Sequence, residues 1–143
     1  MLAQDQMVMT ETDGLRLQRM IGSLRESLRT IGDPYEIYLR ALEDQLARRS
    51  LVPQTDVGDD TVTMNSKVRA RELDTGRSQV LTLVYERDAD LFGEKVSVLT
   101  PLGAAILGSR VGDVVEWQSR RGPRQLRIER ILFQPEAASD FHL

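Results

Sequence analysis

Two carboxylates in the first half of the chain have the side-chain types and the spacing that metal chemistry needs. Asp33 and Glu36 stand three residues apart in the segment GDPYE, so their carboxylates could converge where a helix begins. Hard oxygen ligands of this kind retain a hydrated Mg²⁺, which activates water for attack on a phosphate. A structural role is the alternative, because negative charge in a first helical turn complements the helix dipole. The sequence favours this structural role.

Two amphipathic helices must position these carboxylates. Residues 13–31 form the first, after Thr12 or Asp13 as N-cap, and the second is PYEIYLRALEDQLARR, from Pro34. The short Gly-Asp-Pro break predicts that the two helices fold back as an antiparallel hairpin, a short coiled coil with Asp33 at its tip. The apolar stripes of the two helices consist of Leu17, Met20, Ile21, Leu24, Leu28 and Ile31, and of Tyr35, Tyr38, Leu39, Leu42 and Leu46.

From residue 61 onwards the apolar pattern changes to the period of a β-strand. Strands are predicted at TVTMNSKVRARE, VLTLVY, KVSVLT, DVVEWQ and QLRIERILFQ, and Asn65-Ser66 shifts the phase within the first of these. The segment PLGAAILG interrupts them as one helix of about two turns, begun by Pro101. Several antiparallel strands with one short helix predict an α+β domain.

We therefore expect three parts: a helical hairpin at 1–50, an acidic linker at 51–60 and a β domain at 61–143. Each helical stripe is only wide enough to cover the partner helix, which favours a hairpin that stands apart from the β domain. The alternative, which the sequence leaves open, is that both helices pack on the second half as part of one α+β core.

Composition excludes several classes of function. The chain has 143 residues, no cysteine and one histidine, His142, so disulfides and thiolate or His-rich metal sites are excluded. The net charge is −3, and no segment has the basic surplus that autonomous DNA binding needs. No stretch approaches the length of a membrane span, and the N-terminus lacks the pattern of a signal peptide, so we expect a cytoplasmic protein without a membrane partner.

The segment VSVLTPLGAAILGSRVGDVVEW, residues 96–117, resembles the strand–Thr-Pro–helix–Gly–Gly-Asp–strand signature of the Gre transcript-cleavage factors of bacterial RNA polymerase. SKVRARELDTG resembles the start of the same C-terminal domain. The segments VTMNSKVR, TLVYE and LFQPEAASDF are closer to one branch of the family, the regulators of nucleoside diphosphate kinase. The resemblance covers residues 62–141 and implies an FKBP-like fold for the β domain.

The resemblance also implies a partner, core RNA polymerase. In Gre proteins the globular domain docks on the rim of the polymerase secondary channel, and the coiled coil reaches inward. The bend at Thr100-Pro101, with Leu102 and Gly103, corresponds to the family segment linked to polymerase binding. A structural role for this bend, which would pack the sheet and start the helix, weighs about equally at Thr100 and Pro101.

The hairpin tip is the other family feature. Gre factors carry a Gly-Asp-x-x-acid tip whose carboxylates help to hold a second Mg²⁺ in the polymerase active site, which implies Asp33 and Glu36 for that role here. The predicted arms are clearly shorter than those of Gre factors. A deficit of about ten residues leaves the tip roughly 15 Å short, because each helical residue adds about 1.5 Å.

The sequence therefore predicts a transcription regulator that binds polymerase and competes with Gre-type factors. It predicts no catalytic residue, cofactor or resident metal, and an effect on nucleoside diphosphate kinase that is indirect, through transcription. Asp33 and Glu36 are counted with the polymerase-binding residues. The alternatives are a Gre-like cleavage factor that uses Asp33 and Glu36, and direct control of the kinase or another protein.

Overall fold

The computed structural model describes residues 7–27, 35–90 and 93–140. Its N-terminal part runs strand, helix, helix, strand: β1 (Val8–Thr10), α1 (Glu11–Ser27), α2 (Tyr35–Ala47) and β2 (Ser50–Val52). The two strands pair in parallel, with Val8 opposite Ser50. Neither strand is predicted by the sequence, because three residues are too few to establish an alternating pattern.

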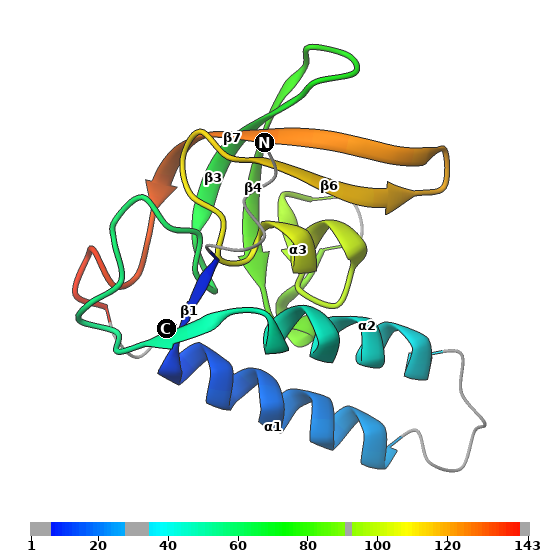
Figure 1. Ribbon diagram of the computed structural model, residues 1–143, viewed down its shortest axis with the longest axis vertical. Coiled ribbons are helices and arrows are strands. Elements are labelled where there is room, and N and C mark those ends of the chain that lie inside the picture. The colour runs from blue at the N-terminus through cyan, green and yellow to red at the C-terminus, as the bar shows by residue number, and fades with distance from the viewer. Residues whose placement is uncertain (1–6, 28–34, 91–92, 141–143) are drawn as a thin grey trace.

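Helix α1 begins earlier than its apolar stripe. The hydroxyl of Thr10 accepts a hydrogen bond from the backbone N–H of Asp13 at 3.0 Å, so Thr10 caps the helix and the predicted caps Thr12 and Asp13 lie inside it. The predicted C-terminal end of α1 and the tip residue Asp33 lie outside the described residues. The two helices run side by side in opposite directions, as predicted (Figure 1).

The C-terminal part is a five-stranded sheet in the order β5-β4-β3-β7-β6. Its strands are β3 (Lys67–Glu72), β4 (Ser78–Val84), β5 (Lys95–Ser97), β6 (Val114–Ser119) and β7 (Gly122–Phe133). All neighbours pair antiparallel except β4 and β5, which pair parallel. The expectation of a wholly antiparallel sheet is wrong at this edge, because the connection that carries the 3-10 turn η2 (Glu86–Asp88) is no tight hairpin and returns the chain to run alongside β4.

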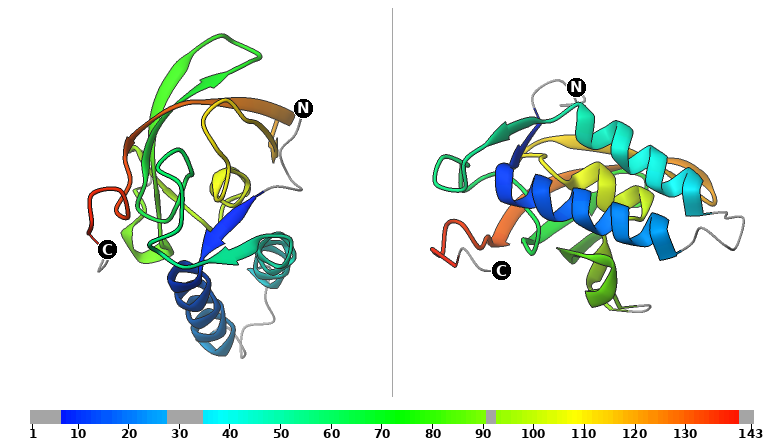
Figure 2. Two further views of the ribbon diagram at one scale, coloured as in Figure 1. Left: turned by 60° about the vertical axis from the view of Figure 1, so that its left-hand side comes forward. Right: turned by 90° about the horizontal axis from the view of Figure 1, so that it is seen from below.

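The sheet curls around the short helix α3 (Pro101–Ile106), and α1 and α2 lie across its open side (Figure 2). The apolar residues Val62, Met64, Val68 and Ala70 are buried as predicted, but the regular alternation holds only within β3. Thr61 and Thr63 are buried as well, and the strand begins at Lys67, so the prediction of a strand over residues 61–66 is wrong. Asn65 has a φ of 67°, a left-handed turn that accounts for the predicted shift of phase. The fold is thus a mixed α+β fold with N-terminal helices and a curled sheet.

The helices and the sheet share one core. Leu17 and Ile21 of α1 and Leu39 and Leu42 of α2 belong to the same cluster of buried residues as Leu83, Ile106, Leu126 and Ile128 of the C-terminal part. This shared core is the alternative that the sequence left open. The stripes are wide enough to contact both the partner helix and the groups inside the curled sheet.

The predicted linker is also tied to the C-terminal part. Its first residues form most of β2, and further on the side-chain amide of Gln134 donates to the carbonyls of Gly58 and Thr61, each at 2.7 Å. No helix of the described residues is long and apolar enough to span a membrane.

Candidate functional site

The start of α3 is fixed by its own side chains. The hydroxyl of Thr100 accepts a hydrogen bond from the N–H of Gly103 at 3.0 Å and donates to the carbonyl of Ser97 at 2.7 Å. A Cβ on Gly103 would lie 2.0 Å from that carbonyl oxygen, so only glycine fits. Leu102 packs against the core, whereas Pro101 is exposed. Of these four predicted residues, three support the bend and Pro101 presents a surface.

Pro101 borders a groove of about 440 Å³ between α2, the segment before α3, and β6. Apolar side chains from all three elements line it: Ile37, Tyr38, Ala41, Leu99, Pro101 and Trp117. Ile37 is 72% exposed and Tyr38 is 46% exposed, which is high for large apolar residues on a helix that also contributes to the core. The groove is therefore a candidate docking surface.

Sequence reasoning missed the helical wall of this groove. Tyr38 is predicted on the buried stripe of α2, but the structure turns its side chain into the groove with Ile37. Ile37 lies off the stripe between Glu36 and Tyr38, and an isoleucine in that position was the available signal. Trp117 packs partly against the core and also lines the groove.

Arg49 holds the two helical walls of the groove together. It follows α2, and its guanidinium donates to the carbonyl oxygens of Leu107 at 2.8 Å and Ala104 at 2.9 Å, at the C-terminal end of α3. The side chain is buried, and desolvation lowers its pKa to about 10. A buried cation that is satisfied by helix carbonyls joins α2 to α3, so the positions of Ile37 and Pro101 are coupled.

On the other helix, Asp13 joins α1 to the β part. Its carboxylate accepts a hydrogen bond from the N–H of Met64 at 3.0 Å, and the hydroxyl of Tyr85 lies 3.5 Å away. Burial raises the pKa of Asp13 to about 6, and the nearby carboxylate of Glu136 adds to the rise. The interaction is within the fold, and none of these residues lines the groove.

Of the two predicted tip carboxylates, the structure describes Glu36, and Asp33 lies outside the described residues. Glu36 accepts hydrogen bonds from Nε of Arg25 on both oxygens, at 3.1 and 3.2 Å, and from Nε of Arg40 at 3.3 Å. The pKa of Glu36 is lowered, and the hydrogen bond from Arg25 is the largest cause. Arg25 also binds Glu43 at 2.7 Å. The charge of Glu36 is thus compensated by Arg25 across the helix pair and by Arg40 one turn along α2.

A metal site does not form among the described residues, which contain no group of three Asp, Glu, His or Cys side chains able to hold an ion. Of the predicted pair, Asp33 lies outside those residues.

Within the described residues, the two helices extend only a short way past their last fully buried positions. The last buried residue of α1 is Ile21 and the first of α2 is Leu39. From there α1 continues to Ser27, about 9 Å, and α2 reaches back to Tyr35, about 6 Å, at about 1.5 Å per residue. Most of each helix covers the curled sheet instead of standing away from it (Figures 1 and 2).

The sequence of this protein is similar to a known protein family and to several of its members. Residues 57–133 match the family described as transcription elongation factor GreA/GreB, C-terminal part. The regulator of nucleoside diphosphate kinase of Escherichia coli K12 is 39% identical over 104 residues, which cover 72% of this chain and 76% of the relative. GreA of Thermotoga neapolitana is 32% identical over 87 residues, which cover 61% of this chain and 55% of that protein.

A solved structure has a similar overall fold. The transcription elongation factor GreA/GreB of Nitrosomonas europaea superimposes with a TM-score of 0.66 at 33% identity, and the match covers 90% of this chain and 98% of that one. The sequence match extends over more than half of the chain, and the solved relative shares the fold of its helices and its sheet. The chain belongs to the GreA/GreB family of transcription elongation factors, and its sequence is similar to the regulators of nucleoside diphosphate kinase in that family.

Proposed function

We propose that this protein is a cytoplasmic, non-enzymatic regulator of transcription that binds bacterial RNA polymerase at the secondary channel. It competes there with Gre-type factors and does not stimulate transcript cleavage. Membership of the GreA/GreB family supports polymerase as the partner. The ion pair between Arg25 and Glu36 carries the non-cleaving part of the proposal.

A second Mg²⁺ needs carboxylate oxygens that face the metal, because its bonds to oxygen are only about 2 Å long. Both oxygens of Glu36 face Arg25, and Arg40 adds another donor. Binding a metal would require breaking this network. The short arms predicted from the sequence support the same conclusion, since each missing helical residue removes about 1.5 Å of reach.

The docking surface that we propose is the groove between α2 and α3. Pro101 and Ile37 supply its exposed apolar surface, while Thr100, Leu102 and Gly103 act by holding the bend in place. An amphipathic helix of the polymerase is the partner chemistry that fits a groove of this kind. Asp33 and Glu36 are proposed as further residues that contact the polymerase, at the channel.

Four further features belong to the same proposal. The β part is an FKBP-like domain and the helices are a shortened coiled coil. Residues 1–50, 51–60 and 61–143 are separate modules in origin although they share a core, and the family match beginning at residue 57 supports that division. One relative is named as a regulator of nucleoside diphosphate kinase. We propose that this protein affects such a kinase only indirectly, through transcription.

A groove variant tests the docking surface. Ile37→Ser removes the most exposed apolar side chain of the groove, and Leu15→Ser is the matched control, because Leu15 is 50% exposed on α1 and lies outside this groove. We expect Ile37→Ser to weaken competition with a Gre factor for core polymerase by about tenfold, roughly 1.4 kcal/mol, and Leu15→Ser to have little effect. Equal effects would reject the groove, and no competition by the unmodified protein would reject the partner.

The alternative is a Gre-like cleavage factor that uses Asp33 and Glu36 to hold Mg²⁺. Backtracked elongation complexes incubated with the protein and Mg²⁺ decide between the two. Faster cleavage that is lost in the variant Asp33→Ala with Glu36→Ala would establish the alternative and reject the proposal.

A further inference from the structure

The outer face of the central strands carries arginines directly opposite one another. Between β3 and β7, Arg69 pairs with Arg130 and Arg71 pairs with Arg127, and all four are exposed. Like charges in directly opposed positions of neighbouring strands destabilise a sheet. The stability of the fold therefore does not account for this arrangement.

Little negative charge compensates these arginines. Glu129 is the one carboxylate among them, and it accepts a hydrogen bond from Nε of Arg71 at 3.0 Å. This hydrogen bond is the largest cause that lowers the pKa of Glu129. Within residues 7–27, 35–90 and 93–140, no ion pair joins Arg69, Arg127 or Arg130 to an acidic side chain. A chain with net charge −3 thus concentrates positive charge on one face.

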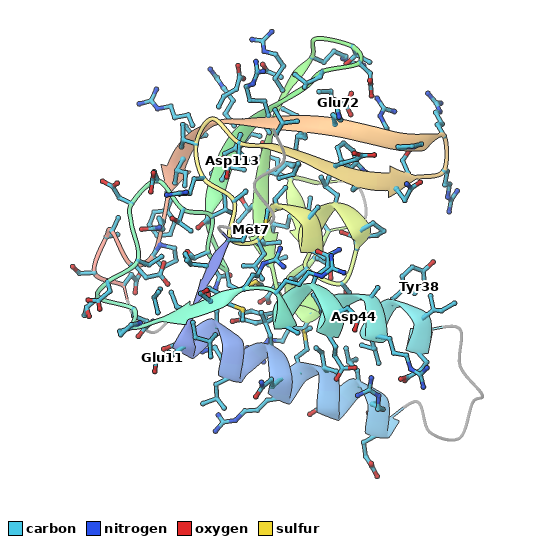
Figure 3. All side chains as sticks on the ribbon, in the orientation of Figure 1. Met7, Glu11, Tyr38, Asp44, Glu72 and Asp113 are labelled. Carbon is cyan, nitrogen blue, oxygen red and sulfur yellow. The ribbon has the colours of Figure 1, made fainter. Side chains whose placement is uncertain are left out.

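The neighbouring strands leave this charge unopposed. On β4 the partners of Arg69 and Arg71 are Val80 and Ser78, and on β6 the partner of Arg127 is Val114. None of these three residues is charged. Figure 3 shows several side chains with nitrogen at their ends that project outward from this side of the sheet.

An exposed aromatic residue continues the row. Phe133 pairs with Lys67 at the end of β7 and is 38% exposed, and Leu132 beside it is 42% exposed. Residues that pair directly in a sheet share a face, so Phe133 lies on the same outer face as the arginines.

We propose that this outer face of β3 and β7 binds single-stranded nucleic acid. The arginines contact phosphates and Phe133 stacks against a base. A row of cations beside an exposed aromatic ring is the arrangement that holds an unpaired strand without sequence preference. Successive outward residues on a strand are about 6.6 Å apart, which lets Arg69 and Arg71 reach different phosphates.

The aromatic residue distinguishes this ligand from an acidic protein surface, which uses the charges and has no need of a stacking ring. It also distinguishes an unpaired strand from a duplex, because the bases of a duplex are already stacked on one another. The proposed docking groove lies on the inner side, with α2 and α3, so the two surfaces can be occupied together (Figure 2). This inference is independent of the proposed function.

The test measures binding of the full chain to a fluorescent RNA strand of about 12 nucleotides, within the usual site size for such surfaces, by anisotropy at several salt concentrations. We expect the logarithm of the affinity to fall with the logarithm of salt with a slope of about −2 to −3, because each of three or four neutralised phosphates contributes about −0.7. The affinity for a DNA strand of the same sequence shows whether binding needs the ribose. The affinity for a duplex of that sequence shows whether binding needs unpaired bases.

Matched variants locate the surface. Arg69→Gln with Arg130→Gln should weaken binding at least tenfold. Arg19→Gln with Arg48→Gln is an equal change of charge at exposed positions on α1 and just after α2, and it should change binding less than twofold. The first pair should not lower the melting temperature, since it removes opposed like charges. Phe133→Leu should weaken binding of the strand more than binding of the duplex.

Three results would overturn the inference. They are no binding of the strand at low salt, equal losses in the two double variants, and displacement of the strand by a polyglutamate peptide at equal concentration of charge. The last would assign the surface to an acidic protein.

Discussion

Nε of Arg25 lies 3.1 and 3.2 Å from the two carboxylate oxygens of Glu36. The two side chains come from different helices, and Arg40 and Glu43 complete the network. A carboxylate that would be a metal ligand in a cleavage factor is here part of the contact between two helices. The negative charge near the end of the helix pair is compensated within the protein.

Removal of Arg25 should therefore be visible at Glu36. In Arg25→Gln we expect the pKa of Glu36 to rise towards the ordinary value for glutamate. The reason is that the hydrogen bond from Arg25, the largest cause of the lowered pKa, is lost. Carboxyl-carbon NMR during a pH titration measures this, with Arg48→Gln as the control. An unchanged pKa of Glu36 would mean that the ion pair does not form in solution.

Asp13 should make stability depend on pH. Its folded pKa of about 6 lies above the ordinary pKa of 3.8 for this carboxyl group, so the folded state holds the proton of Asp13 more tightly. The resulting stability is fully present below about pH 4 and is lost as pH rises through about 6. Between about pH 5 and pH 7.5 the unmodified protein should lose about 1–1.5 kcal/mol relative to Asp13→Asn.

Urea unfolding of both proteins at the two pH values checks this. The charged groups that face Asp13 are Glu136 and Arg16, with the phenol of Tyr85 alongside, and they remain in the variant. The asparagine can still accept the hydrogen bond from Met64. Parallel dependence on pH in the two proteins would contradict the assignment.

Arg49 should matter more than its neighbour Arg48. Arg49→Met leaves the carbonyls of Leu107 and Ala104 without their donor inside the protein, which should cost about 2–4 kcal/mol of unfolding free energy. Arg48→Met, at an exposed position, should cost less than about 0.5 kcal/mol. Chemical denaturation measures both. Similar small losses would show that Arg49 does not join α2 to α3.

The shared core predicts one unfolding transition. Leu39 is 1% exposed, so Leu39→Ala should cost about 2–5 kcal/mol. Helical circular dichroism and the fluorescence of Trp117, the single tryptophan, should lose signal together, since α2 and β6 belong to one cooperative unit. Two separated transitions would favour independent hairpin and β units instead.

The sequence predicted what periodicity can encode. The burial of Val68 and Ala70 within β3 and the helix that begins at Pro101 are confirmed, because these side chains follow the regular pattern of their own elements. Val62 and Met64 are buried as predicted, but they lie in an irregular segment before the strand. The prediction of an antiparallel sheet was wrong for β5, which pairs in parallel with β4. The direction of a strand depends on the path of the connection before it, and an irregular connection has no periodic pattern.

The candidate site was less predictable for a similar reason. Thr100 and Pro101 stand out locally as a cap and a first helical residue, but the groove depends on the packing of α2 near α3, which Arg49 helps to fix. The arginine pairs of β3 and β7 are far apart in the chain and gather only through the register of the sheet. Charge counted along segments cannot reveal them.

The rate of transcript cleavage in backtracked complexes, measured while this protein is titrated with and without a Gre factor, tests the central claim most directly. We predict that the protein slows Gre-stimulated cleavage in proportion to its concentration and leaves the unstimulated rate unchanged. A Gre-stimulated rate that does not fall, or an unstimulated rate that rises, would contradict the account.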